Sequence, residues 1–208
     1  MVLLIIFHST NKLLIDPNAN RWEVPQWLIP RSPPSSIPAL DYSFSYTDSP
    51  FGFAITRTVD NQVLFNSSVP RGATWNGLQF ADQFLSLSTQ LESNSNLYGL
   101  QESAQSKGFK LTQKTYTLWN HDTPAASADT NLYGSHPFYL QVLEDGNSHG
   151  AFLLNSNGMD VDYQSDHLTY STIGGVLDFY FFTGPTADDV IEQYNALIGY
   201  PTMQPYWA

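Results

Sequence analysis

The residues best suited to binding a ligand lie in a polar segment that runs from Trp119 to His136. This segment separates two strand-like runs, and connections longer than about 12 residues between strands are uncommon and often functional. Besides the tryptophan, it contains Asn120, Asp122 and Tyr133. A carboxylate accepts hydrogen bonds from neighbouring hydroxyl groups, and an aromatic ring packs against the apolar face of a sugar. The segment is therefore suited to contact a carbohydrate, although a surface loop without a ligand would have the same composition.

Motifs for other kinds of chemistry are absent from the sequence. There is no glycine-rich phosphate loop, no nucleophile elbow and no histidine spacing typical of zinc. No cysteine is present, which excludes disulfides, thiolate metal ligands and cysteine nucleophiles. The five histidines are scattered over expected loops and strands: His8, His121, His136, His149 and His167. We therefore expect neither a metal site nor a cofactor.

Two further signals are weak on their own. The 19 acidic residues include no pair that the local sequence marks as a general acid and a nucleophile. The two carboxylates of a glycosidase can, however, be distant in the sequence. Asn66-Ser67-Ser68 is an acceptor for N-glycosylation at Asn66, which is meaningful only if the chain is secreted.

Short strand-like runs alternate with turns from residue 40 onward. Apolar and polar residues alternate over 85–91, which is the period of a half-buried strand, whereas 177–182 is apolar enough for both faces to be covered. Turn pairs such as Asp145-Gly146 and Asn157-Gly158 separate the runs. Further strands are expected over 51–57, 109–119, 138–143, 150–154 and 168–172. This spacing is typical of a β-sandwich or a β-barrel.

The two ends of the chain differ from this pattern. Residues 1–7 are apolar but lack a basic flank and a small-residue cleavage site, which favours a buried strand over a signal peptide. Residues 30–38, rich in proline and serine, cannot form a helix or a central strand. We therefore expect N-terminal strands of the sandwich in 1–29, a connector in 30–38 and the main domain in 39–208. Near the C-terminus, a helix is predicted to begin after Thr186, with Asp189 completing a capping box, and to end at Gly199.

The composition restricts the partners that the chain can have. Eight basic residues stand against 19 acidic ones, giving a formal charge of −11. This balance argues against nucleic acid or an anionic membrane as the main partner. No apolar run approaches the roughly 20 residues that a membrane-spanning helix needs, so no membrane insertion is expected. Aromatic residues make up 14% of the chain, which favours a β-rich core or a stacking surface.

Ordered motifs over nearly the whole chain carry a family resemblance. They are residues 16–25, Pro50-Phe51-Gly52-Phe53, Leu64-Phe65-Asn66, residues 80–84, Tyr98-Gly99-Leu100, residues 131–140, 150–159 and 174–178, Gly199-Tyr200-Pro201 and Pro205-Tyr206-Trp207. With them the chain resembles the N-terminal β-sandwich domain of glycoside hydrolase family 31, in the branch of acid α-glucosidase and the intestinal maltases. The resemblance implies an all-β, antiparallel sandwich of the galactose mutarotase type (a supersandwich) with one short C-terminal helix.

The resemblance also implies a role without catalysis. In the family, both catalytic carboxylates of the retaining mechanism lie in a (β/α)₈ barrel that begins just after the signature matching Pro205-Tyr206-Trp207. We therefore expect a fragment with no catalytic residue, inactive alone, which frames the substrate pocket of an α-glucosidase. Its expected partners are an α-linked gluco-oligosaccharide and the barrel of the same parent enzyme. The parent is expected in the secretory pathway, as a lysosomal, extracellular or membrane-tethered protein.

Two residues are carried over as substrate-binding. Asp122 stands where the family has an aspartate that contacts sugar hydroxyls, and Thr123 lies next to it. The sequence departs from the family pattern at His121, where arginine is typical, and at Gln101 and Ser103. The departure at His121 leaves the electrostatics of the loop open.

Other functions remain compatible with the sequence. A free-standing, lectin-like carbohydrate-binding sandwich is the main alternative, and a structural domain that binds no sugar is another. An aldose epimerase shares the general architecture, but no histidine and glutamate are marked as its acid and base.

Overall fold

The computed structural model describes residues 2–7, 11–16, 25, 27, 41–92, 95–124 and 126–207. The connector predicted at 30–38 lies outside the described residues. The strands are β1 (Val2–Phe7), β2 (Asn11–Asp16), β3 (Tyr42–Asp48), β4 (Phe51–Arg57), β5 (Val63–Asn66), β6 (Gln79–Ala81), β7 (Phe84–Gln90), β8 (Asn96–Gln101), β9 (Lys114–Leu118), β10 (Ser135–Val142), β11 (Ser148–Leu153), β12 (Met159–Tyr163), β13 (His167–Thr172) and β14 (Leu177–Phe182). The helix α1 spans Ala187–Ile198.

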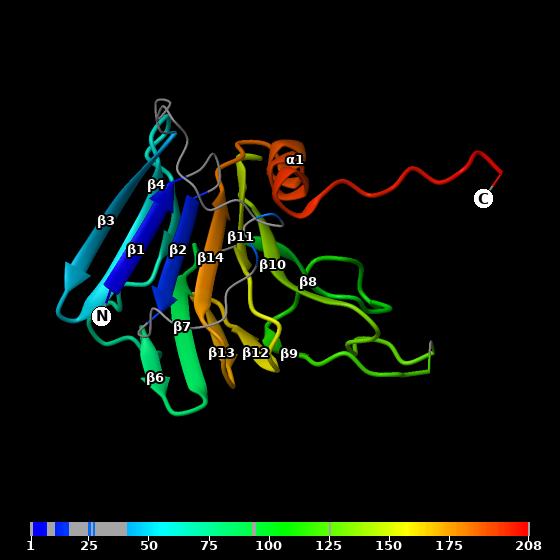
Figure 1. The fold of residues 1–208 in the computed structure, drawn as a ribbon, viewed down its shortest axis with the longest axis horizontal. Helices are drawn as coiled ribbons and strands as arrows, with labels where there is room; N and C mark the ends of the chain where they lie inside the picture. The colour runs from blue at the N-terminus through cyan, green and yellow to red at the C-terminus, as the bar shows by residue number, and fades with distance from the viewer. Residues whose placement is uncertain are drawn as a thin grey trace.

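These strands form three sheets in the described part of the chain (Figure 1). The largest has the order β1-β2-β14-β11-β10-β8, the second β6-β7-β13-β12-β9 and the smallest β3-β4-β5. Every ladder between named strands is antiparallel. The prediction of an all-β, antiparallel sandwich with one short helix is therefore confirmed.

The main core lies between the sheets. Alternate residues of the strands that line it point inward, as the two-residue period of a strand requires. From the six-stranded sheet Leu97, Tyr139 and Leu153 are buried, and from the five-stranded sheet Leu87, Val161 and Tyr170. The small sheet joins this core through Phe65, whose ring centroid lies 5.4 Å from that of Phe179 and 5.0 Å from that of Phe181.

Strand β14 is buried on both faces, as its apolar sequence predicts. Phe179 and Phe181 face the main core, while Tyr180 and Phe182 face a second cluster under α1. That cluster also contains Phe138, Phe152 and Val190. The helix begins with the predicted capping box, in which Thr186 Oγ1 accepts from the backbone N–H of Asp189. Its Tyr194 ring stacks on Phe138 at 4.2 Å between centroids, so α1 covers the outer face of the six-stranded sheet.

The strand predicted over 109–119 is shorter than expected. In the structure only β9, Lys114–Leu118, is extended. The hydroxyl of Tyr116 both accepts from the backbone N–H of Thr112 and donates to its carbonyl, each at 2.9 Å. These two hydrogen bonds hold a bend before β9, and Phe109 on its far side is 80% exposed.

Candidate functional site

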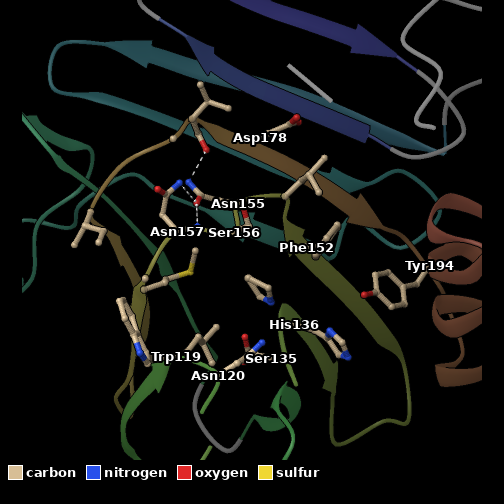
Figure 2. Close-up of a pocket in the computed structure, with 18 residues that line it drawn as sticks. Trp119, Asn120, Ser135, His136, Phe152, Asn155, Ser156, Asn157, Asp178 and Tyr194 are labelled. Atoms are coloured by element: carbon tan, nitrogen blue, oxygen red, sulfur yellow. Dashed lines mark hydrogen bonds between the residues drawn. The ribbon is translucent and has the colours of Figure 1, made fainter. Parts of the chain in front are cut away.

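A cavity of about 970 Å³ opens at one end of the sandwich, next to α1 (Figure 2). Its apolar walls come from the ends of β9 to β12, the turn before β14 and the helix: Leu118, Trp119, Pro137, Phe152, Leu154, Met159, Ile173, Val176 and Tyr194. Its polar lining consists of Asn120, Ser135, His136, Asn155, Ser156, Asn157 and Asp178. In this view Trp119 and Tyr194 stand at opposite sides of the opening. Pockets with apolar walls and a few polar groups are typical of ligand or domain contacts.

Two asparagines fix one wall of this cavity. Asn155 Nδ2 donates to the carbonyls of Gly174 at 2.9 Å and Val176 at 3.1 Å, which ties the turn after β11 to the turn before β14. Its Oδ1 accepts from the backbone N–H and the side chain of Asn157, both at 2.9 Å. Gly175 lies against the side chain of Asn155. Its φ is +80°, and a Cβ there would be 2.6 Å from Asn155 Nδ2. The wall is therefore a close-packed turn that requires glycine at this position.

The polar segment after β9 forms a loop whose two halves are joined at its base. It begins at Trp119 and Asn120 in the cavity lining. The backbone N–H of His121 donates to the carbonyl of Leu132 at 3.1 Å, and Asn131 Nδ2 donates to Asn120 Oδ1 at 3.2 Å. Asn131 and Leu132 are buried, whereas Asn120 and His121 are exposed, so the junction is anchored from one side. We call residues 119–134 the sugar loop, after the chemistry that its sequence predicts.

The residues after β8 hold the outer part of the sugar loop. The backbone N–H of Asp129 donates to the carbonyl of Ala104 at 2.9 Å. The Asp129 carboxylate accepts from the Ser106 hydroxyl at 2.6 Å and from its N–H at 3.2 Å. The Ser106 hydroxyl is the main reason that the pKa of Asp129 is lowered. Lys114 Nζ adds a hydrogen bond to the Asp129 carbonyl at 3.0 Å. The loop is thus braced from two sides.

The two predicted substrate-binding residues, Asp122 and Thr123, differ in how exposed their side chains are. Asp122 is exposed, and its Oδ1 accepts a hydrogen bond of 2.7 Å from the hydroxyl of Tyr133. Thr123 is half-buried, and its Oγ1 is enclosed without a hydrogen-bond partner among the described residues. The Asp122 carboxylate is therefore open to solvent, whereas the Thr123 hydroxyl is enclosed, and neither residue lines the cavity. The pairing of Asp122 with Tyr133 could not be read from the sequence, because 11 residues separate them.

The glycosylation acceptor lies outside the cavity lining. Asn66 ends β5 and is half-buried, and its Oδ1 accepts from the backbone N–H of Ser68 at 3.0 Å. Ser67 between them is fully buried and bonded to the backbone N–H of Phe53 at 2.9 Å. The acceptor is therefore held in a tight side-chain turn at the end of a strand.

The described part of the chain offers neither a metal site nor a membrane-spanning helix. No three His, Asp or Glu side chains described there are grouped closely enough to hold a metal ion. Likewise, none of the described segments forms a helix of the length and hydropathy that crossing a bilayer requires.

Comparisons with known proteins agree with this architecture. The model of the family "Glycosyl hydrolase 31 N-terminal galactose mutarotase-like domain" matches residues 30–162. The chain is 41% identical to Alpha-xylosidase 1 of Arabidopsis thaliana, covering 99% of this chain and 24% of that protein. It is 45% identical to the lysosomal alpha-glucosidase of Mus musculus, over 92% of this chain and 19% of that protein. The chain thus spans about a quarter of such relatives or less.

Solved structures share the fold. A GH31 dextranase of Flavobacterium johnsoniae, complexed with isomaltotriose, superposes with a TM-score of 0.77 at 18% identity. The match covers 99% of this chain and 26% of the dextranase.

Proposed function

This chain belongs to the glycosyl hydrolase 31 N-terminal galactose mutarotase-like domain family, and on that basis we propose that it frames the sugar pocket of an α-glucosidase-type enzyme. The observation that carries the proposal is the sugar loop, which is braced at its base and presents the exposed carboxylate of Asp122. In this role Asp122 accepts hydrogen bonds from sugar hydroxyls and orients the substrate, which lowers the barrier through positioning. Thr123 would reach the sugar only if the loop opened, because its hydroxyl is enclosed.

The proposed substrate is an α-linked gluco-oligosaccharide. Support comes from the relatives, which include proteins named alpha-glucosidase and sucrase-isomaltase. The dextranase that shares the fold was solved with isomaltotriose. Retaining hydrolysis needs two carboxyl groups about 5–5.5 Å apart on either side of the bond. We assign both to the catalytic barrel of the parent enzyme and none to this chain.

The cavity face is the proposed contact surface for that barrel. Trp119 is 60% and Ile173 is 58% exposed at the cavity. Residues 200–207 run away from the sandwich beside α1 and expose Tyr206 and Trp207 (Figure 1). Exposed apolar groups that line the same cavity, such as Trp119 and Ile173, mark interaction surfaces. A free-standing sugar-binding sandwich is the second candidate, since Asp122 is accessible in this chain alone.

We further propose that the parent enzyme enters the secretory pathway. Several relatives are named lysosomal or intestinal enzymes. The acceptor at Asn66 is compatible with glycosylation there.

The test is a chimera in which this chain replaces the matching region of mouse lysosomal alpha-glucosidase. The chimera is expected to hydrolyse maltose, whereas the chain alone is expected to be inactive. In the chimera Asp122→Asn should raise KM about 10-fold or more, the scale of a hydrogen bond to a charged group, with a smaller change in kcat. The control is Asp82→Asn, an exposed aspartate in the β6–β7 turn.

Two results would contradict the proposal. An active chimera in which Asp122→Asn leaves KM unchanged would remove Asp122 from the sugar site. Hydrolysis of maltose by the purified chain alone, lost on substitution of one of its acidic residues, would show that the chain itself is catalytic.

A further inference from the structure

We propose that Tyr133 is a positioning residue, which holds the Asp122 carboxylate in one orientation before a sugar arrives. This inference rests on the proposed function, because it assigns a role to the neighbour of the proposed sugar-binding residue. It predicts that the hydroxyl of Tyr133 contributes to sugar affinity through Asp122 alone.

The first observation is the hydrogen bond itself. The Tyr133 hydroxyl donates to Asp122 Oδ1 over 2.7 Å, a length typical of a hydrogen bond to an ionised carboxylate. Asp122 Oδ2 makes no hydrogen bond to any of the described residues. Because a carboxylate has about four acceptor sites, the phenol uses one and leaves the others for sugar hydroxyls. The carboxylate is therefore held in one orientation, while most of its acceptor sites stay open for a ligand.

The second observation is that the backbone of Tyr133 is itself fixed. On one side of it, the N–H of Leu132 donates to the carbonyl of Glu102 at 3.0 Å. On the other side, the carbonyl of Gly134 accepts from the N–H of Glu102 at 2.9 Å. Leu132 is buried, and a Cβ on Gly134 would lie 3.0 Å from Glu102 Oε2. The residues on both sides of Tyr133 are thus hydrogen-bonded to Glu102, which directly follows β8. The Tyr133 phenol contacts Asp122 in the other half of the sugar loop.

The third observation concerns the charge state of the donor. Tyr133 is 59% exposed, yet its pKa is raised, first by the hydrogen bond to Asp122 and then by burial and the charge of Glu102. The phenol therefore stays protonated and remains a donor at neutral pH. An exposed aspartate without such a partner would lose rotamer freedom when it bound a sugar. The hydrogen bond removes that cost in advance, which is worth about 2- to 10-fold in affinity.

The experiment compares Tyr133→Phe with Asp122→Asn in the mouse alpha-glucosidase chimera. The matched control is Tyr46→Phe, a tyrosine on β3 that is 57% exposed. Tyr133→Phe is expected to raise KM for maltose about 2- to 10-fold, with kcat changed less than about twofold. On the Asp122→Asn background it should add little, because both changes act through the same carboxylate.

The outcomes separate the two proposals. If Asp122→Asn raises KM and Tyr133→Phe does not, the positioning role is overturned and the proposed function stands. If neither variant changes KM, the proposed function fails, and the positioning role fails with it.

A second measurement uses the 208-residue chain without any sugar. NMR of labelled tyrosine side chains, assigned with Tyr133→Phe, follows the titration of the Tyr133 phenol. Asp122→Asn is expected to lower the pKa of Tyr133 towards its ordinary value, because the charged acceptor is lost. An unchanged titration would overturn the inference independently of any sugar binding.

Discussion

The buried His149 on β11 is expected to make the folded chain less stable at acidic pH. The residue is 2% exposed, and its ring meets that of Tyr139 edge-on at 6.1 Å between centroids. Burial, followed by the nearby charge of Arg57, lowers the pKa of His149 from its ordinary value of 6.5 to about 3. The folded state therefore keeps this imidazole neutral, whereas the unfolded chain takes up a proton below about pH 6.5.

The sign and size of the effect follow from this difference. The free energy of unfolding is unaffected by His149 protonation above about pH 6.5, and it falls steadily as the pH is lowered from there towards 3. At roughly 1.4 kcal/mol for each pH unit between the two pKa values, the complete loss is about 5 kcal/mol. Between about pH 7.5 and pH 5, the expected loss is about 2 kcal/mol, a large part of the stability of a typical domain.

Urea unfolding followed by tryptophan fluorescence measures this loss directly. The wild-type chain and His149→Gln are compared at about pH 7.5 and about pH 5. The other titrating groups are present in both proteins, so their effect on the free energy of unfolding cancels in the comparison. His149→Gln is expected to be less stable overall but to lose about 2 kcal/mol less on acidification. His136→Gln, at an exposed cavity position, should keep the wild-type dependence. Parallel loss of stability in the wild-type chain and His149→Gln would refute the reasoning.

Two further predictions concern the remaining charged and polar features. Arg57 is buried and donates to Asp60 and to the carbonyls of Ser148 and Thr183, which joins the small sheet to β11 and the end of β14. Arg57→Lys should therefore cost about 2–4 kcal/mol in urea unfolding, because lysine lacks the planar fork of donors, whereas the exposed Arg71→Lys should change stability by less than about 0.5 kcal/mol. When the chain is expressed behind a secretion signal, Asn66 is expected to carry a glycan that Asn66→Gln and glycosidase treatment both remove. Identical masses for the wild-type chain and Asn66→Gln, after allowing for the substitution, would contradict that assignment.

Elements encoded by local pattern could be predicted from the sequence. Strands β4 and β14 have the bounds expected from their apolar runs, and α1 begins at the predicted capping box of Thr186 and Asp189. Their signals are contained within a few neighbouring residues. Strand β8 was not predicted, since its path depends on positive φ at Gly99 and at Leu100, a non-glycine residue. A Cβ at Gly99 would lie 2.5 Å from the carbonyl oxygen of Phe138, so the reason for this glycine is a contact across the sheet.

The candidate site was predictable in composition but not in geometry. The sequence supplies a tryptophan, amides, a carboxylate and a phenol in one polar segment, and these groups equally fit a loop that binds nothing. The structure adds the backbone hydrogen bonds that join Glu102 to Leu132 and Gly134, and the hydrogen bond that Tyr133 donates to Asp122. These contacts join residues 11 or more positions apart, beyond the reach of any local pattern. A loop held in this way would lose little further freedom on binding, which is why we propose its exposed carboxylate, Asp122, as a ligand contact.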